Sequence, residues 1–116
     1  MNIVTIVLQD APYGSEKVWN ALRLFEALLT LGSRVRIFLY ADSVTAAKKG
    51  QTTPKGFYNI EEMLKKLLSK GAEVRSCLTC TSARGLTQDD FIEGAVVGKT
   101  IDLARWVNEG GQVLVF

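Results

Sequence analysis

The amino-acid sequence predicts an α/β fold, in which a parallel sheet carries helices on both faces within one domain spanning residues 1–116. Two observations support this prediction. Short runs of β-branched and other apolar residues alternate along the chain with amphipathic segments of helical length, which is the order typical of parallel βαβ units. The 116 residues are 47% hydrophobic and 22% charged, as in an ordinary globular domain, and this composition excludes a disordered chain.

The first predicted strand and helix are strongly apolar. Asn2–Leu8 is rich in Ile and Val with almost no alternation, so we expect a central strand that is buried on both faces. Glu16–Leu31 is expected to form a helix with Ser15 as its N-cap and Gly32 as its stop. The apolar arc of this helix is wider than one sheet face can cover, which predicts contact with a neighbouring helix or with another subunit.

The second strand is expected at Arg34–Tyr40, and a long connection follows it. Asn59 then precedes the clearest helical pattern in the chain, and Glu62 stands three residues later, close to the capping-box arrangement. Gly71 is expected to end this helix. The apolar residues at helical spacing are Ile60, Met63, Leu64, Leu67 and Leu68.

The remainder of the chain contains three further strands and two helices. Ala72–Ser76 is a short strand that leads into Cys77, and Glu93–Gly98 is expected to be an edge strand. The helices are predicted at Leu78–Arg84 and Thr100–Asn108, and the last strand is predicted at Gln112–Phe116.

Composition also limits the possible functions. The chain has no histidine, which excludes Ser-His-Asp and Cys-His catalysis within one chain and histidine-based zinc sites. The net charge is +2, with a basic middle third, and we interpret the basic residues as a solvated helix face and loop because no aromatic residues are interleaved for base stacking. We therefore expect neither direct nucleic-acid binding, nor a bound metal, nor a cofactor.

No apolar run approaches the roughly 20 residues of a membrane span, and the first residues lack the pattern of a signal peptide. We therefore expect no membrane association and a cytoplasmic location. In a reducing compartment, two cysteines indicate catalytic, redox or metal-binding roles more often than a structural disulfide.

The main reactive candidate is the segment that begins at Cys77. It follows directly on a predicted strand, at the sheet edge where sites of open α/β folds gather. Backbone N–H groups at the start of the next helix are expected to lower the pKa of Cys77, and Arg84 could add positive charge or bind an anion. Cys80 follows at C-x-x-C spacing, so it could form a disulfide with Cys77 or act as a resolving thiol. Two inert buried thiols are the alternative.

Other residues follow the first two predicted strands and could line a pocket at the same sheet edge. They are equally suited to turns, caps and packing. These pocket candidates are Asp10, Tyr13, Gly14, Asp42 and Tyr58. The segment Gly94–Thr100 superficially resembles a nucleotide-binding P-loop, but its glycine spacing is one residue short and its predicted strand lies inside the motif, so we exclude that function.

Several of these segments together resemble the YchN branch of the DsrE/DsrF-like family. The similarity extends from the first strand to the last and is carried by the combination rather than by any single motif. The segments are Ala11–Glu16, Asn20–Leu24, Ala41–Ala46, Gly50-Gln51, Tyr58–Ile60, Cys77–Cys80 and Ala83–Gly85.

This resemblance implies a three-layer α/β/α domain with a five-stranded parallel sheet and a homo-oligomer, a trimer or a hexamer built from trimers. The TusD-like and DsrE-like relatives accept and pass on sulfur as a cysteine persulfide. Their sulfur-carrying cysteine stands eight residues before a glycine that follows an arginine, a relation that Cys77 has to Arg84-Gly85. The resemblance thus implies that Cys77 carries sulfur between a protein donor and a protein acceptor, whereas Cys80 belongs to the YchN branch alone.

Three hypotheses follow. The first is a sulfur-relay protein, a sulfurtransferase-type carrier in which Cys77 holds the sulfur, Arg84 stabilises the anion and Cys80 assists release. The second is a non-catalytic oligomeric module that binds a small ligand or a partner segment. The third is a thiol–disulfide oxidoreductase that uses the C-x-x-C pair.

Overall fold

The computed structural model describes residues 2–116, which form a five-stranded, all-parallel sheet in the order β4-β3-β2-β1-β5. The strands are β1 (Ile3–Leu8), β2 (Arg34–Leu39), β3 (Glu73–Cys77), β4 (Ala95–Gly98) and β5 (Gln112–Val115). The helices are α1 (Lys17–Thr30), α2 (Ile60–Ser69), α3 (Leu78–Ala83) and α4 (Thr100–Asn108), with two 3-10 helices, η1 (Ala41–Ala47) and η2 (Gln88–Asp90). The predicted α/β architecture is confirmed.

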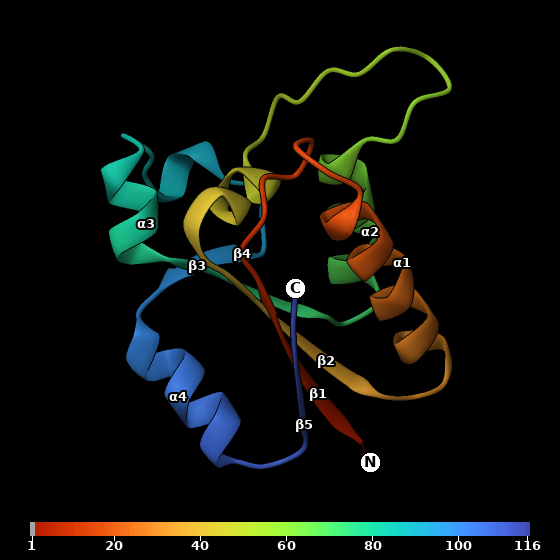
Figure 1. Ribbon diagram of the computed structural model, residues 1–116, viewed down its shortest axis with the longest axis vertical. Coiled ribbons are helices and arrows are strands. Elements are labelled where there is room, and N and C mark those ends of the chain that lie inside the picture. The colour runs from red at the N-terminus through yellow and green to blue at the C-terminus, as the bar shows by residue number, and fades with distance from the viewer. Residues whose placement is uncertain (1) are drawn as a thin grey trace.

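Helices cover both faces of the sheet, with α1 and α2 on one side and α4 on the other (Figure 1). The larger core lies under α1, α2 and η1 and contains the inward residues of β1 and β2. The smaller core lies under α4. It consists of Val7, Phe38, Cys77, Leu103 and Trp106. Cys77 therefore belongs to the thinner layer, which a single nine-residue helix covers.

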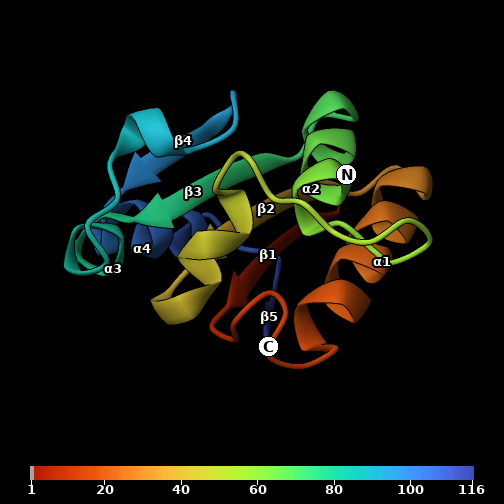
Figure 2. The ribbon, with the colours of Figure 1, turned by 90° about the horizontal axis from the view of Figure 1, so that it is seen from above.

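The strand positions agree with the predictions in most respects. β1 is an interior strand that pairs with β2 on one side and β5 on the other, although the middle of the sheet is β2. β4 is an edge strand, as predicted, and Figure 2 shows it at the end of the sheet beyond β3. All five strands point the same way, so the segments after β1, β2 and β3 meet at one edge.

The helix caps differ at one position. Asn59 caps α2 as predicted, because its side-chain oxygen accepts a hydrogen bond of 3.0 Å from the Glu62 N–H. Ser15 is not the N-cap of α1; that position belongs to Glu16, whose side chain makes no capping bond. The Ser15 hydroxyl instead donates to the Asp10 carboxylate while it accepts from the Lys17 N–H.

The wide apolar arc of α1 is explained in part by α2, which packs beside it. A groove of about 480 Å³ runs between the two helices, with Trp19 and Met63 among its lining residues. Leu24 and Leu31 of the α1 segment still face solvent, at 40% and 82% exposure.

The α4 side of the sheet is covered unevenly. No helix of residues 2–116 lies over the β5 end of this face, where Val113 and Val115 are 42% and 60% exposed. Valines on a strand of a parallel sheet are ordinarily buried under a helix. Because these two valines are exposed, this end of the sheet presents an apolar surface to solvent. Among residues 2–116, no helix is long and apolar enough to cross a membrane.

Candidate functional site

Cys77 lies at the carboxyl end of β3 and precedes α3, as predicted, although it is the last residue of the strand rather than the residue after it. Its partner in the parallel pairing with β4 is Gly98, the last residue of that strand. The Cys77 side chain is 4% exposed, Cys80 is half-buried, and both thiols are free. The two cysteines are thus at the carboxyl edge of the sheet, beside the start of α4.

The electrostatic environment of Cys77 differs from the expectation. Burial raises the pKa of the Cys77 thiol, and the side chain of Cys80 raises it further. The backbone N–H groups of Cys80 and Thr79 favour the thiolate, as the sequence suggested, but they do not outweigh burial. The prediction of a lowered pKa was therefore wrong, because the strand end that carries Cys77 is packed under α4.

Cys77 opens onto a cavity of about 440 Å³ between the ends of β3 and β4. The cavity is lined by Cys77, Leu78, Thr79, Lys99, Thr100 and Ile101. A neighbouring groove of about 410 Å³ shares Leu78, Lys99 and Ile101 with it and continues along α4 to Arg105. Residues 2–116 contain no group of three or more Cys, Asp or Glu side chains that could hold a metal ion.

Tyr40 contacts Thr100, one of the residues that line the cavity. Its hydroxyl and that of Thr100 are 2.9 Å apart, a hydrogen-bond distance. The Tyr40 ring packs edge-on against Phe38, with 4.9 Å between ring centroids, and contacts the small core that contains Cys77. Tyr40 therefore connects the end of β2 to the first residue of α4, which fixes one wall of the cavity.

Arg84 does not act on the Cys77 sulfur in this structure. Its Nε and Nη2 donate to Asp42 Oδ1 at 3.0 and 2.7 Å, and its Nη1 donates to the Cys80 carbonyl at 3.0 Å. The guanidinium thus links η1 to the end of α3. Arg84 and Asp42, predicted separately as an anion-binding group and a pocket residue, form an ion pair that holds the cysteine helix in place.

Asp10 and Gly14 organise the loop after β1 rather than the cavity at Cys77. The Asp10 carboxylate accepts from Ser15, and its carbonyl accepts from the Ser43 hydroxyl. The Gly14 N–H donates to the Ala11 carbonyl at 3.2 Å. These bonds are turn and loop contacts, the alternative that the sequence left open.

Tyr13 and Tyr58 do come together, with ring centroids 5.7 Å apart in a stacked arrangement. The two tyrosines do not line the cavity at Cys77. They lie where the loop after β1 meets the start of α2. The Tyr13 hydroxyl donates to Gln51 Oε1 at 2.6 Å and accepts from the Ile60 N–H at 3.0 Å. Tyr13 therefore anchors the long connection that follows η1.

Residues 2–116 match the model of the DsrE/DsrF-like family. The chain belongs to this family. It is 41% identical to protein YchN of Escherichia coli K12 over the whole of both chains, and 41% identical to the uncharacterised protein MK0008 of Methanopyrus kandleri over the whole chain and 95% of that protein.

Solved structures agree with this assignment. The crystal structure of YchN from E. coli superposes with a TM-score of 0.94 at 40% identity, with both chains fully covered. MTH1491 from Methanobacterium thermoautotrophicum, a protein of unknown function, superposes with a TM-score of 0.80 over 98% of this chain and 97% of its own. At 17% identity this second similarity shows a shared DsrE-like fold alone.

The residues that sequence reasoning missed are Tyr40, Lys99 and Thr100. Lys99 and Thr100 lie in the P-loop-like segment Gly94–Thr100. Strand β4 lies inside this segment, as predicted, whereas in a nucleotide-binding P-loop the strand precedes the motif. A usable signal was present nonetheless. Residues that directly follow two adjacent parallel strands meet at one edge, so Lys99 had to lie near Cys77 once β3 and β4 were paired.

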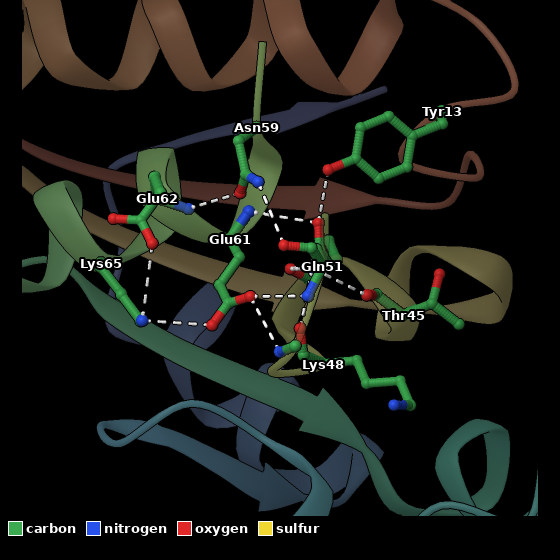
Figure 3. A network of polar contacts seen from close by, with 10 residues as sticks. Tyr13, Thr45, Lys48, Gln51, Asn59, Glu61, Glu62 and Lys65 are labelled. Carbon is green, nitrogen blue, oxygen red and sulfur yellow. Dashed lines mark hydrogen bonds and ion pairs between the residues drawn. The ribbon is translucent and has the colours of Figure 1, made fainter. Parts of the chain in front are cut away.

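Beyond the cysteines, this member of the DsrE/DsrF-like family has a dense polar network around Gln51 (Figure 3). The Gln51 amide nitrogen donates to the carbonyls of Ala46 and Lys48 at 2.9 and 2.8 Å. Its amide oxygen accepts from the Tyr13 hydroxyl and from the Glu61 N–H. One side chain thus joins η1, the loop after β1 and the first turn of α2.

Glu61 completes the network although it is only 6% exposed. Its Oε1 accepts from the N–H groups of Gly50 and Gln51 at 2.9 and 2.8 Å, and its Oε2 is 3.1 Å from Lys65 Nζ. Burial alone raises the pKa of Glu61, but the Gln51 N–H and the Lys65 ammonium outweigh it, so the pKa is lowered overall. The carboxylate form is therefore the one that the fold stabilises.

Replacing Glu61 by glutamine should destabilise the protein by about 1–2 kcal/mol at neutral pH, because the new amide nitrogen faces two N–H groups or an ammonium. A carboxyl whose folded pKa is lowered stabilises the fold above its unfolded pKa, and this contribution is lost as the pH falls through the folded pKa. The difference between wild type and E61Q in urea unfolding should therefore shrink in acid.

The matched control is E62Q, because Glu62 is on the same helical turn and pairs with Lys65 only at 3.6 Å, with its side chain 69% exposed. This variant should change stability by less than about 0.5 kcal/mol. Equal losses for E61Q and E62Q would show that the backbone bonds of Glu61 contribute nothing specific.

Proposed function

We propose that this protein carries sulfane sulfur on Cys77 as a persulfide. The observation that supports this most directly is that Cys77, a free thiol, lines a cavity at the carboxyl edge of the sheet and lies next to a second free thiol. Membership of the DsrE/DsrF-like family is consistent with a sulfur-relay role. A buried thiol with little exposure also suits a carrier, since water and oxidants reach the bound sulfur less readily.

The transfer balances without an external oxidant. In the loading step, the Cys77 thiol and a donor persulfide anion R–S–S⁻ give Cys77–S–S⁻ and the thiol R–SH. A bond forms between Sγ and the outer sulfur, the donor S–S bond breaks, and its electron pair and the Cys77 proton leave with R–SH. In the release step, an acceptor thiolate attacks the outer sulfur, and the Cys77 thiol is restored when it takes up a proton.

Cys80 offers a second route of release. Its thiol can attack the Cys77 sulfur of the persulfide, which gives a Cys77–Cys80 disulfide and hydrogen sulfide. The adjacency of the two sulfurs also favours thiol–disulfide exchange as a second candidate function. In that case the disulfide, rather than the persulfide, would be the stable oxidised form.

Intact-mass measurement after incubation with a cysteine desulfurase and cysteine separates these functions. We expect a gain of about 32 Da that maps to Cys77 after gentle alkylation. A stable loss of about 2 Da with no persulfide would indicate the oxidoreductase. An unchanged mass with this donor and with small persulfides would contradict both, and favour a binding module.

We also propose that the protein works in the cytoplasm as a homo-oligomer, a trimer or a hexamer. The support is the apolar end of the sheet at Val113 and Val115, together with the exposed leucines of the α1 segment. Surfaces of this kind are typical of obligate interfaces, which persist at about 10 µM. Sedimentation equilibrium at that concentration should show an oligomer, and a monomer would contradict the proposal.

A further inference from the structure

Lys99 is the charged residue that lines the cavity at Cys77. Within residues 2–116 it forms no ion pair, whereas Asp102, the nearest acid along the chain, is engaged elsewhere. The Asp102 carboxylate accepts from the Lys99 backbone N–H at 2.7 Å and pairs with Arg105 at 3.2 Å. The ammonium of Lys99 thus has no ion-pair partner within residues 2–116, and its side chain lines the same cavity as Cys77.

The position of Lys99 is fixed by the sheet. Gly98 is the register partner of Cys77, so Lys99 follows the strand end next to the one that carries the thiol. A side chain at Gly98 would meet Asp102 Oδ2 at 3.2 Å and the Arg75 side chain at 3.4 Å, which leaves this strand end closely packed. The backbone from which Lys99 extends is therefore fixed by the close packing at Gly98 and by the bond from the Lys99 N–H to Asp102.

Further charged residues line the groove that adjoins the cavity. The groove that shares Lys99 with the cavity ends at Arg105, so two cations and one carboxylate line the combined space. Because the carboxylate of Asp102 pairs with Arg105, the net positive charge of this lining is that of Lys99, and the surface offers this charge to a ligand.

The size of the opening restricts the donor. Cys77 is 4% exposed, so a cysteine held rigidly on the folded surface of a partner protein reaches its sulfur less readily than a small molecule does. The cavity of about 440 Å³ lies within the roughly 300–1,000 Å³ typical of small-molecule sites. The geometry thus favours a low-molecular-weight donor over a protein donor for the loading step.

We propose that the cavity binds a small sulfane-sulfur compound that carries an anionic group. Lys99 forms an ion pair with this group, and the sulfane sulfur contacts the Cys77 thiol. The proposal rests on the function proposed above and names its donor class. Two kinds of donor share this chemistry. A carboxylate-bearing persulfide loads Cys77 by the exchange written above, whereas thiosulfate, with the Cys77 thiolate, gives Cys77–S–S⁻ and sulfite, which leaves with the electron pair of the broken S–S bond.

The test compares two persulfides of equal size, those of 3-mercaptopropionate and of 3-mercaptopropionamide, with thiosulfate as a third donor. The wild type should be loaded on Cys77 about fivefold faster by the carboxylate than by the amide, the effect of one partly exposed charge contact. In K99M this ratio should fall to about one, while the rate with the neutral amide should change less than about twofold. The variant K55M, altered in the long loop before α2, should keep the wild-type ratio.

The outcomes separate this proposal from the carrier function. If K99M keeps the wild-type preference, or if the wild type shows none, the donor assignment is wrong while Cys77 can still be a carrier. Loading by a desulfurase protein alone, with no loading by any of the three small donors, would likewise overturn the donor assignment. If no donor of either kind loads Cys77, the carrier function itself fails. Fast loading by thiosulfate that K99M abolishes would identify the oxyanion as the preferred form.

Discussion

Replacing Cys77 by serine should abolish the sulfur-loaded form of the protein, whereas replacing Cys80 by serine should leave loading intact. A hydroxyl has the shape of a thiol without its nucleophilicity, so C77S removes the atom to which the sulfur binds. Cys80 is half-buried and is not among the residues that line the cavity. The measurement is the gain of about 32 Da by intact mass, with the site assigned by peptide mapping.

The matched pair C77S and C80S controls for disturbance of the small core, since each replaces one sulfur by oxygen. Circular dichroism should show the same helix content for both variants. Loading of C77S at the wild-type level on Cys80 would contradict the assignment of Cys77 as the carrier. Loss of loading in both variants would show that the pair acts as a unit.

The raised pKa of Cys77 adds a dependence on pH that has a definite sign. Because burial and the Cys80 side chain disfavour the thiolate, alkylation of Cys77 should be slow near neutral pH and should accelerate as the pH rises. In C80S one of the groups that raise the pKa is changed, so Cys77 should react faster than in the wild type at the same pH. A slower reaction would mean that the Cys80 side chain favours the thiolate instead.

The fold was predictable because its elements are specified locally. The continuous apolar run of β1, the alternation of strands and helices, and the cap of α2 by Asn59 all depend on residues close together in the sequence. The cap of α1 was predicted wrongly for the opposite reason. The Ser15 hydroxyl is held by Asp10, so the competing bond comes from a loop whose path the sequence does not show.

In the candidate site, too, the features set by nearby residues were predictable and the features set by long-range packing were not. The strand-end position of Cys77 follows from the pattern, but its burial under α4 and its raised pKa depend on packing between distant segments. Arg84 was expected to assist the thiolate because it is near in sequence, yet Asp42, 42 positions earlier in the chain, binds it. Lys99 and Thr100 became visible only with the pairing of β3 and β4.

Replacing Gly111 by alanine should destabilise the fold by about 3 kcal/mol or more, the largest stability effect that we expect from a single methyl group. Gly111 precedes β5 and has a φ of +95°, a conformation that costs other residues free energy. A Cβ at this position would also collide with the carbonyl oxygen of Ile3 in β1. Since a backbone carbonyl in the sheet cannot rotate away, β5 would have to shift from β1.

Gly110 provides a control in which only the conformational cost is present. Its φ is also +95°, but a Cβ there would have no neighbour within 4 Å. G110A should therefore cost only about 1 kcal/mol, and the difference between the two variants in urea unfolding isolates the collision with Ile3. Because β5 carries the exposed Val113 and Val115, a displaced strand should also weaken self-association in G111A and not in G110A. Equal losses of stability in the two variants would show that β5 tolerates the shift, and that the close approach of β1 and β5 does not hold the sheet edge.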